Sequence, residues 1–225
     1  MVIWPPEAPL FLQASSTIIT TDMTDRASEL EAAASLITIE SLDAANATVI
    51  MSCQEYLRRA DLFSQRLPTV RPEERHKFAR ALALTILGHL PTRPGTCPFC
   101  IQYGRSQSCV GCGYAGTHGR CDCNDSSFSL FIEAFHMLGR SIFQDTGKLN
   151  CHPDEAGRRL RASIQASRDL AMEMIESLPS ASALELMERK AWYLDQMIRV
   201  LPMALLDPEV EERRLLVQKA LLNYW

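Results

Sequence analysis

Glycine, long apolar runs and surplus basic charge are all scarce in this sequence of 225 residues. The net charge is -4, from 23 Lys and Arg against 27 Asp and Glu, which argues against binding nucleic acid or an anionic membrane through a basic surface. No stretch approaches the ~18 apolar residues that span a bilayer. The first basic residue is Arg26, whereas a signal peptide carries basic residues before its apolar stretch. We therefore expect a cytoplasmic protein without a membrane segment.

Alternation of Val, Ile and Thr with polar residues, which marks a half-buried strand, is also absent. Apolar residues instead recur every three to four positions, and prolines and capping Ser or Asp residues separate the repeats. This pattern predicts an all-α fold, a helical bundle of about seven helices. The expected helices cover about 22–39, 41–66, 72–90, 126–144, 153–178, 182–201 and 207–224.

The helix over 182–201 has the most regular pattern. Its apolar residues alternate steps of four and three, which predicts a seam against an antiparallel or coiled-coil neighbour. These residues are Met187, Ala191, Leu194, Ile198 and Leu201. We expect three parts in the chain: an N-terminal arm over 1–21, a helical bundle over 22–91 and 126–225, and a Gly/Cys-rich metal-binding insert over 92–125 between the third and fourth helices.

The insert holds six of the ten glycines and six of the eight cysteines. Its cysteines form a Cys97-Pro-Phe-Cys100 turn, a Cys109-Val-Gly-Cys112 turn and a Cys121-Asp-Cys123 pair. In a reducing compartment such clusters indicate metal or redox chemistry more often than disulfides. Two C-x-x-C turns supply four thiolates, enough to close a tetrahedral site around one ion. Gly113 follows the second turn, and we expect it to have the positive φ that lets the chain turn back.

The paired turns over residues 97–114 resemble the cysteine knuckles of zinc ribbons and rubredoxin-type sites. The resemblance covers about 18 residues of 225 and implies a metal site held by Cys97, Cys100, Cys109 and Cys112. Zinc is the metal we expect. An iron–sulfur cluster is the alternative, because Cys109-Val-Gly-Cys112-Gly-Tyr-Ala resembles the start of a ferredoxin motif with Ala115 in place of its third cysteine.

Cys121 and Cys123 are expected to form a second metal site or to extend the first. A disulfide between them is disfavoured because residues separated by one position bridge only with strain. His118 and Cys151 are the candidates to complete this second set. His118 ranks first, because Cys151 must come back along the 126–144 helix, roughly 28 Å at 1.5 Å per residue, or come from a second subunit.

The remaining candidates are interpreted as structural. Cys53 falls on an apolar helix face and is expected in the core, and the lone helical histidines, His76, His89 and His136, are expected on the surface or as satisfied core residues. No P-loop, dinucleotide-binding glycine motif, G-x-S-x-G or HExxH is present. The insert has few large apolar residues, so we expect it to fold only with its metal while the helical flanks hold without it.

These features predict a metal-binding helical protein whose Cys-rich insert forms a recognition or assembly surface, as in an adaptor, a maturation factor or a complex subunit. The 182–201 seam and the arm over 1–21 favour a protein partner or a homo-oligomer. One alternative is an iron–sulfur redox or electron-transfer protein. The other is an enzyme with an open metal site near His118 or Cys151, although no complete catalytic signature supports it.

Overall fold

The computed structural model describes residues 26–104, 109, 111–121, 123–147 and 151–224. The predicted arm over 1–21 and the start of the first predicted helix lie outside these residues. The described part of the chain is all-α and contains no strand, so the predicted fold class is confirmed. The seven helices expected in the flanks each have a counterpart: Arg26–Ser35, α2 (Ile39–Arg66), α3 (Arg75–Gly88), α6 (Ser127–Gln144), α7 (Pro153–Ser177), α8 (Ala183–Arg199) and α9 (Pro208–Tyr224).

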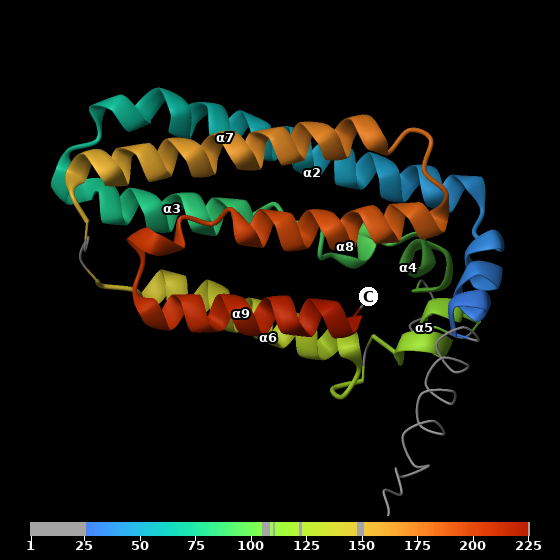
Figure 1. The fold of residues 1–225 in the computed structure, drawn as a ribbon. Helices are drawn as coiled ribbons and strands as arrows, with labels where there is room; N and C mark the ends of the chain where they lie inside the picture. The colour runs from blue at the N-terminus through green and yellow to red at the C-terminus, as the bar shows by residue number, and fades with distance from the viewer. Residues whose placement is uncertain (1–25, 105–108, 110, 122, 148–150, 225) are drawn as a thin grey trace, which may run out of the picture.

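The long helices are stacked as three antiparallel pairs (Figure 1). The closest packing joins α2 to α7 at one side of the bundle and α6 to α9 at the other, and α3 and α8 lie between these two pairs. Two further helices of six residues each, α4 (Pro98–Tyr103) and α5 (Gly113–His118), lie in the segment over 92–125. They sit at the end of the bundle where α2 begins.

The starts of the long helices follow from the local sequence. The hydroxyl of Ser126 accepts a hydrogen bond from Ser129 N at 3.1 Å at the start of α6. Ser182 and Glu185 form a complete capping box at the start of α8, which satisfies two backbone N–H groups that the first turn leaves without a helical partner. Pro153 and Pro208 open α7 and α9, where a missing N–H costs nothing.

The core lies between the three pairs and contains the side chains that the periodicity placed there. The predicted seam of α8 is buried along its whole length, as are Cys53 and Tyr56 of α2, which have no exposed surface. The Tyr56 hydroxyl donates to Ser167 of α7, so the polar atom that this large side chain brings into the core is satisfied. Cys53 is a core residue, as predicted.

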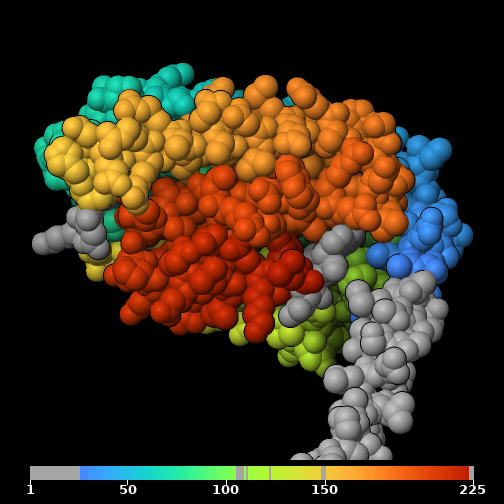
Figure 2. All heavy atoms as spheres, in the orientation of Figure 1, coloured from blue at the N-terminus to red at the C-terminus, as the bar shows by residue number. Residues whose placement is uncertain are grey.

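Apolar side chains on the surface are scattered over several helices. The most exposed are Leu36, Ile39, Phe143 and Leu222. Figure 2 shows the face that α7, α8 and α9 cover. No single described helix is both long and apolar enough to cross a membrane, whereas Arg26–Ser35 and Ile39–Thr69, bent by 100°, meet that test when taken as a pair.

Candidate metal centre

Both C-x-x-C turns coincide with the start of a short helix. Cys97 is the N-cap of α4, with Pro98 at its first position, and Cys112 is the N-cap of α5. The expectation that Gly113 has a positive φ is wrong, because this glycine begins α5. The left-handed residues are Cys109, Gly111 and Gly119, with φ of 47°, 80° and 81°, so the chain reverses within the second C-x-x-C turn and again after α5.

Contacts with distant residues hold the two short helices against the bundle. The Gln102 amide of α4 accepts from Thr38 N at 2.7 Å and donates to Leu36 O at 3.0 Å, which fixes α4 to the turn before α2. Phe99 and Tyr114 are almost fully buried, and their ring centroids lie 5.7 Å apart. Because these rings belong to the main core, the segment over 92–125 is packed more firmly than its scarcity of large apolar residues predicted.

Three thiols from two separate stretches of chain line one small cavity. Cys97, Cys100 and Cys121 face a cavity of about 50 Å³, together with the ammonium-bearing side chain of Lys190 and an apolar wall. The rest of the lining is Pro91, Thr92, Arg93, Pro94, Tyr114, Phe128, Phe131, Met187, Ala191 and Leu194. Of the two expectations for Cys121, a second site or an extension of the first, its position beside the first C-x-x-C turn fits the extension.

The thiols interact in a chain that leaves one of them more acidic than the others. Hydrogen bonding to Cys100 and burial raise the pKa of Cys97 well above its usual range. Contact with Cys121, together with burial, raises the pKa of Cys100 to about 12. Cys121 accepts the hydrogen bond from Cys100, and this lowers its pKa. Thiolate character is therefore concentrated on Cys121, and the other two thiols retain their protons at neutral pH.

Cys112 and Cys109 do not line this cavity but interact electrostatically with the thiols that do. Burial raises the pKa of Cys112, which is also within electrostatic range of Cys97, Cys100 and Cys121. The charge of a Cys109 thiolate acts to raise the pKa of both Cys112 and Cys121. Five of the six cysteines of the segment thus interact with one another. All of them are free thiols, and no group of three or more Cys, His, Asp or Glu side chains in the described residues has the arrangement of a metal site.

The other predicted ligands lie in different surroundings. His118 stacks on Tyr114 with ring centroids 4.2 Å apart, and its Nδ1 lies 2.7 Å from the Thr117 hydroxyl. Burial lowers the pKa of His118. Cys123 lies in the turn before α6, where its N–H donates to Arg120 O. Cys151 lies two residues before α7, and the start of α7 is at the opposite end of the bundle from α4 and α5 (Figure 1), so within one chain it does not complete a site with Cys121.

Lys190 is the residue of this site that the sequence interpretation missed. It occupies a buried position on the apolar face of α8, between Met187 and Leu194, with 6% of its surface exposed. Its Nζ donates to Thr96 O at 2.7 Å, directly before Cys97. The sequence did contain a signal for it. The apolar repeat of this helix places position 190 on the buried face, and a lysine there is unusual.

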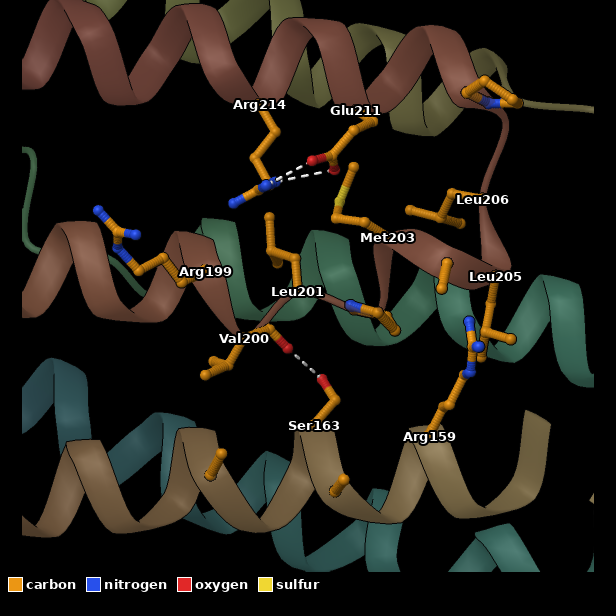
Figure 3. Close-up of a pocket in the computed structure, with 15 residues that line it drawn as sticks. Arg159, Ser163, Arg199, Val200, Leu201, Met203, Leu205, Leu206, Glu211 and Arg214 are labelled. Atoms are coloured by element: carbon orange, nitrogen blue, oxygen red, sulfur yellow. Dashed lines mark hydrogen bonds and ion pairs between the residues drawn. The ribbon is translucent and has the colours of Figure 1, made fainter. Parts of the chain in front are cut away.

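A much larger and open hollow lies elsewhere on the described surface (Figure 3). Its volume is about 810 Å³, between α7, the α8–α9 connection and α9. The three arginines at its rim are each ion-paired within their own helix, Arg159 with Glu155, Arg199 with Asp195 and Arg214 with Glu211. The Ser163 hydroxyl donates to Val200 O. These polar groups are therefore already paired with other protein groups, and they do not converge on the hollow as the polar groups of a ligand site do.

The predicted structural histidines fit their interpretation where the structure gives a partner. His76 is buried, with Nε2 3.1 Å from Asp145 Oδ2, and His89 Nδ1 lies 2.7 Å from Thr85 O. No known protein family, curated protein or solved structure matches this chain. The thiol group and its buried lysine are therefore the features from which a function has to be argued.

Proposed function

We propose that this chain is a zinc-binding helical protein in which Cys97, Cys100, Cys112 and Cys121 hold one ion. The observation that supports the proposal is the meeting of Cys121 with the first C-x-x-C turn at a small cavity. Thiolates at about 2.3 Å from zinc form closed tetrahedral sites. The thiols are gathered but not at coordinating distance, so binding draws them inward while zinc displaces their protons.

The size of the cavity favours a single ion over a cluster. Its volume is about 50 Å³, and a cavity needs about 10–15 Å³ of such volume to hold one water molecule. A zinc ion fits this space with its ligands around it, whereas several irons with bridging sulfides need the walls to move. The fifth thiol, Cys109, is the observation that keeps an iron–sulfur redox centre as the second candidate, since it offers a cluster an alternative ligand.

Metal analysis of anaerobically purified protein tests the proposal. We expect a colourless protein with one zinc per chain, and brown protein with iron and sulfide supports the second candidate instead. Cys121→Ser and Cys100→Ser each lower the zinc content sharply. Cys53→Ser is the matched control, because this thiol is buried in α2, and Cys109→Ser separates the two ligand sets. If Cys121→Ser keeps its full zinc content while Cys109→Ser loses zinc, the ligands are the set predicted from spacing, with Cys109 in place of Cys121. Absence of metal from the native protein overturns the proposal.

The assembly role is proposed for the same end of the molecule. Leu36 and Ile39 are 68% and 74% exposed and flank the turn that Gln102 of α4 holds. A metal that fixes α4 therefore also fixes an apolar surface suited to a second copy of the chain. Light scattering should give a dimer mass that Leu36→Ser with Ile39→Ser reduces to a monomer. The control pair, Met51→Ser with Leu62→Ser, changes exposed apolar residues farther along α2, which are 61% and 45% exposed. A monomer in the native protein contradicts this role.

A further inference from the structure

Lys190 is a buried cation without a carboxylate partner in the described part of the chain. Its side chain donates to Thr96 O at 2.7 Å and lies 4.0 Å from the Met187 sulfur. Burial lowers the pKa of Lys190, and the nearby thiols of Cys97 and Cys100 oppose that shift. Removing an ammonium from water is unfavourable when no opposite charge compensates it, so this position calls for a negative partner.

The proposed metal centre supplies that partner. Four thiolates around one divalent ion carry a net charge of −2. Burying that charge away from water without an opposite charge is unfavourable, as it is for the lone ammonium. Apart from Thr92 and the exposed Arg93, the rest of the cavity wall is mostly apolar, with Phe128, Phe131 and Leu194 among its residues. In so apolar a surrounding, an opposite charge is screened little and acts strongly at short range.

We propose that Lys190 is the charge-balancing and positioning residue of the metal centre, an inference that rests on the proposed function. Its ammonium offsets one of the two negative charges of the loaded site. Its hydrogen bond to Thr96 O ties the backbone just before Cys97 to α8, so the first thiolate is held where the ion needs it. Groups that orient or polarise metal ligands from outside the coordination sphere typically change metal affinity by about 10–100-fold.

Two substitutions separate the charge from the hydrogen bond. Lys190→Met keeps the length and apolar stem but removes both, whereas Lys190→Gln keeps an amide N–H that can donate to Thr96 O. We expect Lys190→Met to bind zinc about 10-fold more weakly or worse, and Lys190→Gln to lose a smaller part of the affinity because it keeps the donor to Thr96 O; both are measured by competition with a chromophoric chelator. Lys77→Met is the control, because it removes the same charge from an exposed position of α3 and should leave the affinity unchanged.

Thermal unfolding of the metal-free proteins provides a readout that a merely structural lysine would not give. Without metal the ammonium lacks its counter-charge, so Lys190→Met should unfold at the same or a higher temperature than the native chain. Native affinity in both variants overturns the inference but leaves the zinc site intact. Native affinity in Lys190→Gln alone assigns the effect to the hydrogen bond and overturns charge balance. Absence of zinc from the native chain overturns the proposed function, and the inference with it.

Discussion

The bundle and the cysteine segment of this molecule are built by different means. Each long helix of the bundle has at least 14 residues, and α2, α6 and α8 start at a side-chain cap. The helices of the segment, α4 and α5, have six residues each and no side-chain cap. Isolated helices that short do not form in water, so α4 and α5 depend on what they touch.

Several contacts that fix the segment on the bundle reach far along the chain. Gln102 bonds the turn before α2, Lys190 of α8 bonds Thr96, and Arg26 donates to Thr117 O. The bundle is thus specified by patterns within each helix, whereas the segment is specified by where the bundle has already placed its neighbours. The comparison teaches that loss of the bundle should remove the segment, while damage to the segment should leave the bundle folded.

Leu160→Ala tests the first half of this comparison and should have the largest effect. Leu160 of α7 has no exposed surface, and truncating such a leucine costs about 2–5 kcal/mol because a cavity remains. We expect urea unfolding at a much lower concentration, with circular dichroism and thiol reactivity changing together. Arg161→Ala, on the exposed side of the same helix, is the control. Exposure of the thiols well after the helices have melted would contradict the dependence of the segment on the bundle.

Asp145 tests a polar contact that holds the opposite end of the bundle. Burial raises the pKa of its carboxyl, but hydrogen bonds from Gly147 N, Asp207 N and His76 outweigh that effect and lower the pKa. Because the folded pKa lies below the unfolded one, the stabilisation is present above the ordinary value of about 3.9 and disappears as pH falls through the folded pKa.

Asp145→Asn should therefore destabilise the protein by about 2 kcal/mol at pH 7, the range for a hydrogen bond to a charged group. The difference from the native chain should shrink below pH 4, measured by urea unfolding at several pH values. Asp169→Asn, an exposed change on α7, is the control. A difference that stays constant into acid would show that the charge of Asp145 is not what the three donors stabilise. Thiol reactivity at pH 7 should be unchanged, because the segment lies at the other end.

Two glycines of α5 test how tightly the segment is docked. A Cβ at Gly113 would collide with the Cβ of Ala33 in the helix Arg26–Ser35, whereas a Cβ at Gly116 meets nothing within 4 Å. Gly113→Ala should cost about 1–3 kcal/mol through overpacking, seen as faster proteolysis within 92–125 while bundle helicity remains. Gly116→Ala should be neutral or slightly stabilising, since alanine is the better helix former. Equal behaviour of the two variants would mean that α5 does not rest on that helix.

The same contrast explains how much of the structure could be predicted from the sequence. Helix starts at Ser126 and Ser182 were predictable because the capping residue and the apolar repeat are neighbours in sequence. The 3-10 turn Pro94–Thr96 and both short helices were not, because no periodic signal fits in six residues. The direction of α5 depends on Ala33 and Phe99, and no local rule connects those positions.

The candidate site was predictable in its members but not in its grouping. Spacing indicated that the cysteines of 97–112 belong together, and Cys97, Cys100 and Cys112 do interact. Cys121 joins them because the left-handed Gly119 returns the chain toward α4 after α5. Such a reversal depends on a positive φ, and a glycine can take either sign of φ with similar ease. The spacing of the cysteines alone could therefore not assign Cys121 to the first site.

The capping box of α8 gives the smallest expected effect and tests whether the bundle supports the site through Lys190. Ser182→Ala removes the hydroxyl that accepts from Glu185 N at 3.3 Å, which costs about 1 kcal/mol in a typical helix. The helix should fray at its first turn, which lies within two turns of Lys190 on the N-terminal side. We expect a small fall in unfolding midpoint and unchanged zinc affinity, because Lys190 is held by the buried seam and by Thr96 rather than by the cap. Ser180→Ala, exposed in the preceding turn, is the control. A marked loss of zinc affinity in Ser182→Ala would mean instead that α8 transmits the order of its first turn to the metal centre.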